Sequence, residues 1–405
     1  MKKSFKEPGP SARIVVSKSQ KRDFNVLDLF CGTGAISYGL KSGDARFKVV
    51  GGLDVNPSAC ATASANHIGG TFLCKSITEM SPKQFSDRAR VTRVDMVVGG
   101  PPCQGLSSLR PNRQTNINDP RNRLYKGFVD YVRYFEPTVF LMENVIGLVN
   151  HADGRLLQEI LTAFSSIGYA TDWRILNAAN YGVPQKRERI IITGVSQRRV
   201  ARPALNYPAP THFFDGRVIG TRYKSNYIVN PTKGTPSISL DMAISDLPKL
   251  RSGEAKHAYS GPPRTEYQKQ RRSNSQHLTL HEAADHSEKM LKVMRLAGSS
   301  KGALPAGLVS SGFTSCYSRM SRHEPAPTIT VKFTSPASSK CIHPTQDRAI
   351  TPREAARIQS FDDSFIFRGS KTEIASQIGN AVPPLLGKAM APLFVENLEA
   401  ARNAA

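Results

Sequence analysis

The chain has 405 residues, 39% of them hydrophobic and 21% charged, a balance typical of a soluble protein with a sizeable core. No apolar run is long enough to cross a bilayer, and Met1 to Arg22 lacks the hydrophobic stretch of a signal peptide, so we expect a cytoplasmic protein. Lys and Arg number 55 against 32 Asp and Glu. The formal net charge of +23 favours a polyanionic partner such as nucleic acid.

The cysteines lack the spacing of metal ligands. None of the six forms a Cys-x-x-Cys pair and no histidine cluster lies beside them, so the sequence predicts neither a metal site nor a disulfide framework. They are Cys31, Cys60, Cys74, Cys103, Cys316 and Cys341.

The first ordered elements follow a basic segment, residues 1–23, which we interpret as a flexible arm. A strand (Val26–Phe30), a turn (Cys31–Gly34) and a helix (Ala35–Leu40) are predicted next. The two glycines of the turn let a ligand approach the backbone, although the full Gly-x-Gly-x-x-Gly dinucleotide motif is absent.

A second predicted strand, Val49–Leu53, ends in Asp54. An acidic side chain at this distance from a glycine turn is typical of one that binds ribose hydroxyl groups, so the pair predicts a nucleoside cofactor. The alternative is that Asp54 caps a helix that starts near Pro57.

A third apolar run, Val94–Val98, leads into Gly99–Gly105, which contains two prolines and Cys103. The prolines stiffen this segment and the glycines admit a substrate, as the position of a nucleophile requires. A tight loop with a buried thiol would have the same residues, so the segment alone leaves both possibilities open.

Leu124 begins a run with helical spacing that Pro137 stops, and Thr138–Met142 predicts a strand that ends at Glu143. Because the carboxyl ends of parallel strands meet at one edge of a sheet, we expect Glu143 near Cys103. An exposed strand end is the alternative.

Donor side chains alternate along the segment that enters the predicted strand Ile190–Val195. Gln185, Arg187 and Arg189 would lie on one side of an extended chain, as a fork suited to a base carbonyl or a phosphate. Alternating charges on a solvated surface would give the same pattern.

The remaining chain is irregular before it becomes helical. Residues 198–272 are rich in Pro, Ser and Gly, and their basic and aromatic residues are interleaved as in surfaces that contact phosphates and bases. Thr351–Glu354 predicts a capping box with a proline at the first helical position. Gln377–Pro384 predicts a turn before a terminal helix that ends at Leu398.

Together these segments resemble the cytosine-5 DNA methyltransferases over nearly all of residues 24–400. The motifs occur in the family's order and at suitable spacings, which is far more specific than any single motif. They are Asp28–Gly34, Pro101–Gln104, Glu143–Val145, Gln185–Arg189, Arg353–Gln359 and Gly379–Pro384.

The resemblance implies an α/β fold of the class I S-adenosylmethionine-dependent methyltransferases. This is a Rossmann-like, doubly wound, mostly parallel sheet with a smaller, irregular, largely β target-recognition domain. The implied segments are the basic arm (1–23), a catalytic and cofactor-binding domain (24–197), the target-recognition domain (198–345), a hinge helix region (346–371) and a C-terminal segment that completes the catalytic domain (372–405).

The resemblance also assigns roles in catalysis. Cys103 is the thiolate that adds to C6 of a cytosine flipped out of the duplex, and Glu143 stabilises the charge that develops at N3. Arg189, with Arg187 nearby, holds O2 and nearby phosphates, and Gln185 of the same motif is a further catalytic residue. C5 then takes a methyl group from S-adenosyl-L-methionine.

The implied contacts to this cofactor come from Phe30, Gly32, Gly34, Asp54, Pro101, Leu124 and Asn380. One position departs from the family, because Ser76 stands where an aspartate often contacts the adenine.

The resemblance implies double-stranded DNA as the partner of a bacterial or phage modification enzyme. We expect a monomer associated with the nucleoid, with any cognate restriction endonuclease acting separately. A tRNA cytosine methyltransferase of the same family is one alternative, which the long basic insert disfavours. An inactive DNA-binding regulator is another, which the intact site residues oppose. A dinucleotide oxidoreductase would not explain the Cys103 segment.

Overall fold

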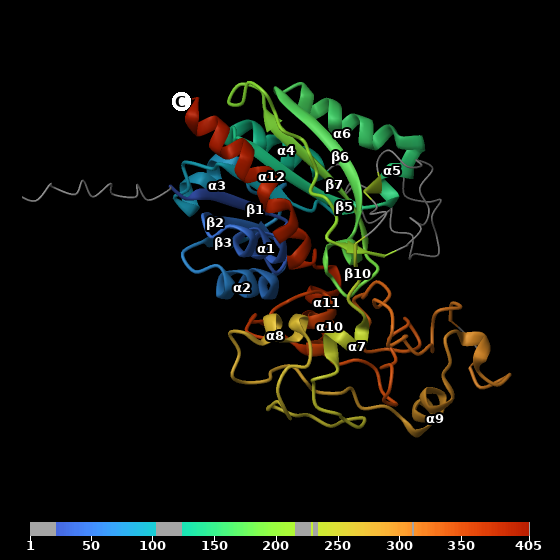
Figure 1. The fold of residues 1–405 in the computed structure, drawn as a ribbon. Helices are drawn as coiled ribbons and strands as arrows, with labels where there is room; N and C mark the ends of the chain where they lie inside the picture. Colours follow the sequence, from blue (N-terminus) through green and yellow to red (C-terminus); the bar gives the residue numbers. More distant parts are fainter. Residues whose placement is uncertain (1–21, 103–123, 215–227, 230–233, 310–311, 405) are drawn as a thin grey trace, which may run out of the picture.

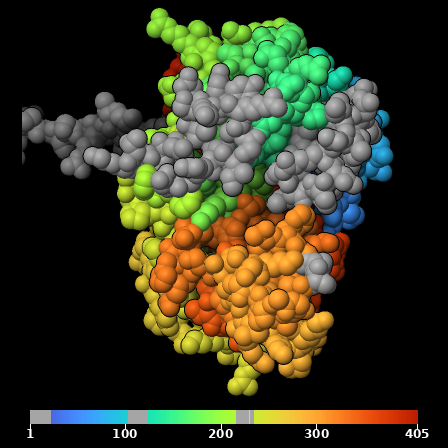
Figure 2. Space-filling model, turned by 90° about the vertical axis from the view of Figure 1, so that its right-hand side faces the viewer, coloured from blue at the N-terminus to red at the C-terminus, as the bar shows by residue number. Residues whose placement is uncertain are grey.

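The computed structural model describes residues 22–102, 124–214, 228–229, 234–309 and 312–404, which form two lobes (Figure 1). The large lobe contains the main sheet and the C-terminal helix. The small lobe, residues 234–370, lies below it in Figure 1. The turned view of Figure 2 shows the yellow and orange small lobe stacked beneath the green and blue large lobe.

The main sheet has the strand order β3-β2-β1-β4-β5-β7-β6-β9. β7 runs antiparallel to both of its neighbours, while every other neighbouring pair is parallel. This arrangement confirms the doubly wound, mostly parallel sheet. Its strands are β1 (Phe24–Leu29), β2 (Phe47–Asp54), β3 (Thr71–Cys74), β4 (Met96–Gly99), β5 (Val139–Val145), β6 (Tyr169–Asn177), β7 (Glu188–Ser196) and β9 (Ile228–Val229).

Helices cover both faces of the sheet (Figure 1). Successive side chains of a strand point to opposite faces, so Val26 packs in the core with α1 and α12 while Leu27 packs with α3, α4 and α6. The helices of the large lobe are α1 (Ala35–Gly43), α2 (Pro57–Asn66), α3 (Pro82–Ala89), α4 (Leu124–Phe135), α5 (Gly147–Asn150), α6 (Arg155–Ser165) and α12 (Pro384–Asn403), with the 3₁₀ turns η3 (His151–Gly154) and η4 (Ala178–Tyr181).

Glycines let α1 and α12 pack against each other at very short range. A Cβ on Gly39 would lie 2.0 Å from the carbonyl oxygen of Pro384, and a Cβ on Gly387 would lie 2.5 Å from that of Ile36. No side chain larger than hydrogen fits at either position unless the helices move apart. The C-terminal segment therefore completes one face of the large lobe. α12 extends beyond Leu398, the residue at which we expected it to end.

The small lobe is irregular, as expected, but the expectation of a largely β domain is wrong for the described residues. Strands after β7 have only two residues each, and β9 joins the main sheet. Proline-rich sequence leaves few consecutive N–H donors for a ladder. The regular elements there are β10 (Thr235–Pro236), α7 (Leu240–Ile244), α8 (Glu266–Arg272), α9 (Glu288–Leu296), η5 (Lys301–Ala303) and α10 (Pro352–Ile358). β10 pairs with β8 (His212–Phe213), which precedes the small lobe, and α11 (Lys371–Asn380) lies between the lobes (Figure 1).

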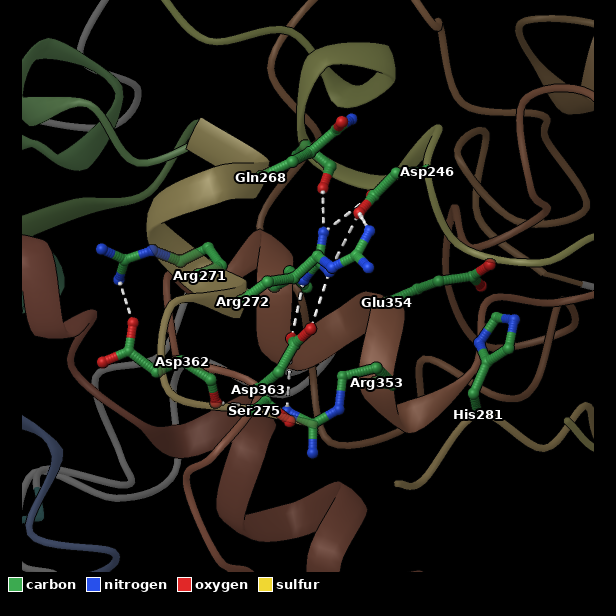
Figure 3. Close-up of polar contacts among 12 residues, drawn as sticks. Asp246, Gln268, Arg271, Arg272, Ser275, His281, Arg353, Glu354, Asp362 and Asp363 are labelled. Carbon is green, nitrogen blue, oxygen red and sulfur yellow. Dashed lines mark hydrogen bonds and ion pairs between the residues drawn. The ribbon is translucent and has the colours of Figure 1, made fainter. Parts of the chain in front are cut away.

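Buried ion pairs hold the small lobe together around α10 (Figure 3). The guanidinium group of Arg357 lies 2.9 Å from Asp246 and 2.7 Å from Asp363, and all three side chains are fully buried. Arg348 pairs with Glu354 at 2.7 Å, and the predicted capping box of α10 is present. Each of these buried charges has a partner of opposite charge, so loss of one partner would leave an unpaired charge in the interior of the small lobe.

Candidate active site

The turn after β1 has an unusual backbone that opens space in front of α1. Phe30, Gly32 and Gly34 have φ values of 53°, 51° and 71°. A Cβ on Gly32 would have no atom within 4 Å, so there is room beside this residue for a ligand. The predicted strand, turn and helix are confirmed, and the N-terminal N–H groups of α1 follow the turn directly.

Two buried groups stabilise the same turn. Burial raises the pKa of Asp28 to about 8, and its carboxyl group accepts a hydrogen bond from Ser37. The Nε2–H of His67 donates to the carbonyl oxygen of Gly34 at 2.9 Å, and burial lowers the pKa of this imidazole to about 4. His67 is therefore neutral at pH 7.

Asp54 is fixed at the end of β2 by two backbone donors. Its Oδ2 accepts from the N–H of Gly32 at 2.8 Å, and its Oδ1 accepts from that of Asn56 at 2.9 Å. Each carboxylate oxygen keeps a second lone pair, which a ribose hydroxyl group could use. Asn56, rather than Asp54, caps α2, so the capping alternative for Asp54 is wrong.

The segment that leads to Cys103 is anchored by β5. Gly99 pairs with Met142 across β4 and β5, which brings Gly100 beside Glu143. The Nδ2 of Asn144 donates to the carbonyl oxygen of Pro101 at 3.0 Å, and both residues are buried. Cys103 itself lies outside the described residues.

Glu143 forms an ion pair with Arg189 at the edge where β5 and β7 meet. The Nε of Arg189 lies 2.7 Å from Oε1 of Glu143, and each side chain is 13% exposed. A Cβ on Gly100 would lie 2.9 Å from the other carboxylate oxygen of Glu143. β5 continues through Glu143 to Val145, further than the predicted end at Met142. A carboxyl group and a guanidinium group thus lie together beside the segment that precedes Cys103.

Gln185 and Arg187 are buried and contact segments far along the chain. Gln185 donates from Nε2 to Gln359 at 2.8 Å and accepts at Oε1 from the N–H of Ile329 at 2.8 Å. The guanidinium group of Arg187 donates to the carbonyl oxygens of Ile329 and Gly379 at 3.2 and 3.1 Å. The expected fork of donors for a base or phosphate is therefore not formed by all three residues. Gln185 and Arg187 already donate their hydrogen bonds to Gln359 and to main-chain carbonyl groups.

The pKa of Arg187 depends on its burial and on the nearby Glu143–Arg189 pair. Burial lowers its pKa, the nearby guanidinium group of Arg189 lowers it further, and Glu143 raises it. Its Nε is buried without a hydrogen-bond partner. Arg187 is thus a buried cation close to the carboxyl group of Glu143.

The other predicted cofactor residues lie on different elements. Phe30 and Leu124 are partly buried against the core, Pro101 is buried, and Asn380 is exposed at the C-terminal end of α11. The turn predicted over Gln377–Pro384 is only partly present. The capping box at Ser370 starts α11, which continues through Asn380, so the turn is limited to Ala381–Pro383.

One exposed apolar residue at this site was not predicted from the sequence. Val55 follows Asp54 and is 67% exposed, which is unusual for a valine directly after a buried strand. The signal in the sequence was its position: an apolar side chain directly after the acidic residue that ends a strand can pack against the flat ring of a bound nucleoside. Ser76 is half-buried, and its hydroxyl group hydrogen-bonds that of Thr78 at 2.7 Å.

The family model for C-5 cytosine-specific DNA methylases matches residues 24–394. This chain belongs to the C-5 cytosine-specific DNA methylase family. S-adenosyl-L-methionine is the methyl donor of the family, and the open glycine turn, the fixed Asp54 carboxylate and the exposed Val55 fit a nucleoside cofactor.

Relatives of this DNA methylase include restriction-modification enzymes. The type II methyltransferase M.AgeI of Thalassovita gelatinovora is 33% identical, over 90% of this chain and 97% of its own. M.DdeI of Desulfomicrobium norvegicum is 34% identical, over 91% of this chain and 87% of its own.

Solved structures share the fold of this DNA methylase. A prophage-encoded DNA modification methyltransferase from E. coli has a TM-score of 0.71 at 21% identity, covering 93% of this chain and 99% of its own. Spodoptera frugiperda DNMT2 has a TM-score of 0.56 at 16% identity, covering 92% of this chain and 100% of its own. Within the described residues, no helix is long and apolar enough to cross a membrane.

Proposed function

We propose that this DNA methylase modifies a cytosine flipped out of double-stranded DNA within a short specific sequence. The observation that carries the proposal is the Glu143–Arg189 pair, which lies beside the segment that leads to Cys103. A carboxyl group and a guanidinium group are a matching pair for N3 and O2 of a cytosine, which lie next to each other on the ring.

In this proposal Cys103 forms a bond to C6 as its thiolate. A proton moves from the carboxyl group of Glu143 to N3, so the ring does not carry a full negative charge. C5 gains nucleophilic character and takes a methyl group from S-adenosyl-L-methionine. Loss of the C5 proton to a base then expels the Cys103 thiolate and restores the aromatic ring.

The remaining site residues would position these groups. Asn144 would hold Pro101, and with it the start of the Cys103 segment, while Gln185 and Arg187 would fix the strand that presents Arg189. Asp54 would bind the ribose hydroxyl groups of the cofactor, the turn at Gly32 and Gly34 its amino-acid end, and the apolar face of Val55 its adenine ring. Phe30, Leu124 and Asn380 would complete the surroundings of the cofactor.

The small lobe would contact the DNA. Segment boundaries at residues 24, 198, 346 and 372 stay predictions, with 198–345 as the target-recognition domain. The type II relatives support a modification enzyme with a separately acting endonuclease. We also propose that the enzyme acts as a monomer in the cytoplasm at the nucleoid, because one cytosine is modified at a time.

Methyl transfer from labelled S-adenosyl-L-methionine to unmethylated genomic DNA, followed by sequencing of the modified bases, tests this function. We expect 5-methylcytosine in one short recurring context. Cys103→Ser should lose methyl transfer while cofactor and duplex binding stay close to wild type, because only the attacking sulfur is lost. Comparable turnover by Cys103→Ser contradicts the mechanism. Label in tRNA alone would point to the RNA branch of the family, and no label in either to an inactive DNA-binding regulator.

A further inference from the structure

Three thiols, Cys31, Cys60 and Cys74, lie beside the proposed ribose site, near the carboxyl ends of β1, β2 and β3. Cys60 of α2 points at this edge, with its Sγ 3.7 Å from the carbonyl oxygens of both Asp54 and Leu73. Cys74 is the last residue of β3 and pairs with Asp54 in the parallel register. Its Sγ lies 3.4 Å from the carbonyl oxygen of Val55. Two thiols therefore contact the backbone of the residues that would face the cofactor.

The positions of Cys60 and Cys74 bring their side chains to one place. Cys60 contacts the carbonyl oxygen of Leu73, the residue before Cys74, so its sulfur lies next to Cys74 at this edge. The neighbouring Cys31 thiol lowers the pKa of Cys60, whereas burial raises the pKa of Cys74.

Access from solvent distinguishes the three thiols. Cys31 and Cys60 are 7% and 6% exposed, whereas Cys74 is exposed. A small oxidant would therefore meet Cys74 first, with Cys60 next to it at the same edge of the sheet. Within the described residues, no group of three or more Cys, His, Asp or Glu side chains could hold a metal ion, so a bound metal does not explain the cluster.

We propose that Cys60 and Cys74 form a reversible disulfide bond when a hydroperoxide reaches Cys74, and that this bond weakens cofactor binding. Cys74 reacts first because it is the exposed thiol, although its pKa is raised. It gives its proton to water, attacks the peroxide as the thiolate and becomes a sulfenic acid, with release of hydroxide or an alkoxide. The thiolate of Cys60 then attacks the Cys74 sulfur, forms the S–S bond and expels a second hydroxide. Two thiols lose two electrons in total, and the peroxide O–O bond accepts them.

The disulfide should lower the affinity for the cofactor because it shortens the distance between the Cys60 and Cys74 sulfur atoms. A disulfide brings its sulfur atoms to about 2.05 Å, much closer than two sulfur atoms that are not bonded can lie. Cys60 and Cys74 must then shift relative to the carbonyl groups of Asp54 and Val55. This effect rests on the proposed role of Asp54 as the ribose ligand, whereas formation of the disulfide does not.

The test uses the full chain in a Cys103→Ser background, so that oxidation of the proposed nucleophile cannot affect the result. The protein is treated with hydrogen peroxide, digested without reduction and mapped by mass spectrometry. Binding of S-adenosylhomocysteine is measured by calorimetry before oxidation, after oxidation and after dithiothreitol. A Cys74→Ser variant cannot form the bond. A Cys341→Ser variant removes a buried thiol elsewhere and is the matched control.

We expect a peptide that joins Cys60 to Cys74, and an affinity about tenfold lower after oxidation that dithiothreitol restores. Cys74→Ser should keep its affinity under peroxide, and Cys341→Ser should respond as the parent does. A map that joins Cys31 to Cys60, or that shows Cys74 only as sulfinic acid, overturns the disulfide. A joined peptide with unchanged affinity overturns its effect on the cofactor. Lack of binding before oxidation would instead contradict the cofactor site, and the peptide map would still decide the disulfide.

Discussion

Single residues at the strand edge do more than supply reactive atoms. Glu143 contacts Arg189 on one side and closely approaches Gly100 on the other, so its carboxyl group is held in one place before any substrate binds. Such fixed polar groups stabilise a developing charge without having to reorient during the reaction.

Glu143→Gln tests this placement. The amide keeps the size of the side chain but cannot give a proton to N3, so we expect single-turnover methyl transfer to fall about 10²- to 10⁴-fold. Glu136 pairs with Arg198 on the surface, with side chains 61% and 74% exposed, and Glu136→Gln is the matched control. Glu143→Gln with the wild-type rate, in the presence of a normal control, would show that Glu143 is not the proton donor.

His67 predicts a loss of stability in acid. Burial lowers its pKa from 6.5 to about 4, so between these values the unfolded chain binds a proton that the folded chain does not. The free energy of unfolding should therefore fall as the pH drops through this window, by at most about 1.4 kcal/mol per pH unit from this group.

Urea unfolding between about pH 7 and pH 5 checks this expectation. His67→Gln cannot titrate and should show a shallower dependence on pH, while replacement of the exposed His323 by Gln should leave the dependence unchanged. Equal slopes for wild type and His67→Gln would exclude His67 as a source of acid sensitivity.

At the scale of elements, the large lobe is connected to the small lobe through α11. Arg187 donates to Gly379 of this helix, and Gly379 packs directly on the backbone of the small lobe. A Cβ on Gly379 would lie only 2.5 Å from the backbone nitrogen of Val331. A backbone group so close cannot rotate away as a flexible side chain could.

Gly379→Ala should therefore destabilise the protein, by about 1–3 kcal/mol, because the segments at this crossing must separate. The midpoint of urea unfolding measures the change. Gly261 has no atom within 4 Å of an added Cβ, and Gly261→Ala should unfold close to wild type. Equal midpoints for the two variants would mean that the crossing adjusts without cost.

The sequence predicts elements well where the signal is local. The apolar run before the glycine turn and the helical spacing after Leu124 lead directly to β1 and α4. β6 was missed because half-buried polar residues interrupt its apolar pattern. The contacts of Gln185 with Ile329 could not be predicted, since the two residues are 144 positions apart and neither carries a local signal for the other. The ion pair of Glu143 with Arg189 likewise depends on the register of β5 and β7, which the sequence does not indicate.

The whole molecule combines a strong positive charge with two stacked lobes. The formal net charge is +23 on 405 residues, and the small lobe, residues 234–370, contributes to it with 19 Lys and Arg against 12 Asp and Glu. Binding to a duplex should then release many counterions from the phosphates.

We expect the affinity for duplex DNA to fall about 10³-fold or more between about 50 and 200 mM salt. Binding of S-adenosylhomocysteine is the internal control, because the site we propose for it uses backbone groups and the Asp54 carboxylate rather than a cationic surface. Fluorescence anisotropy for the duplex and calorimetry for the cofactor measure the two dependences. Equal responses would argue against a cationic DNA-binding surface.

The close contact between α1 and α12 has a consequence for how the protein is made. During translation α1 leaves the ribosome early, but α12, the helix that packs on it, is made only after the whole small lobe. A nascent chain, or one truncated before Pro384, has the glycine turn yet leaves the apolar side of α1 in water. Methylating activity should therefore begin only when translation has passed α12, and premature stop codons in the gene should leave chains that bind no cofactor.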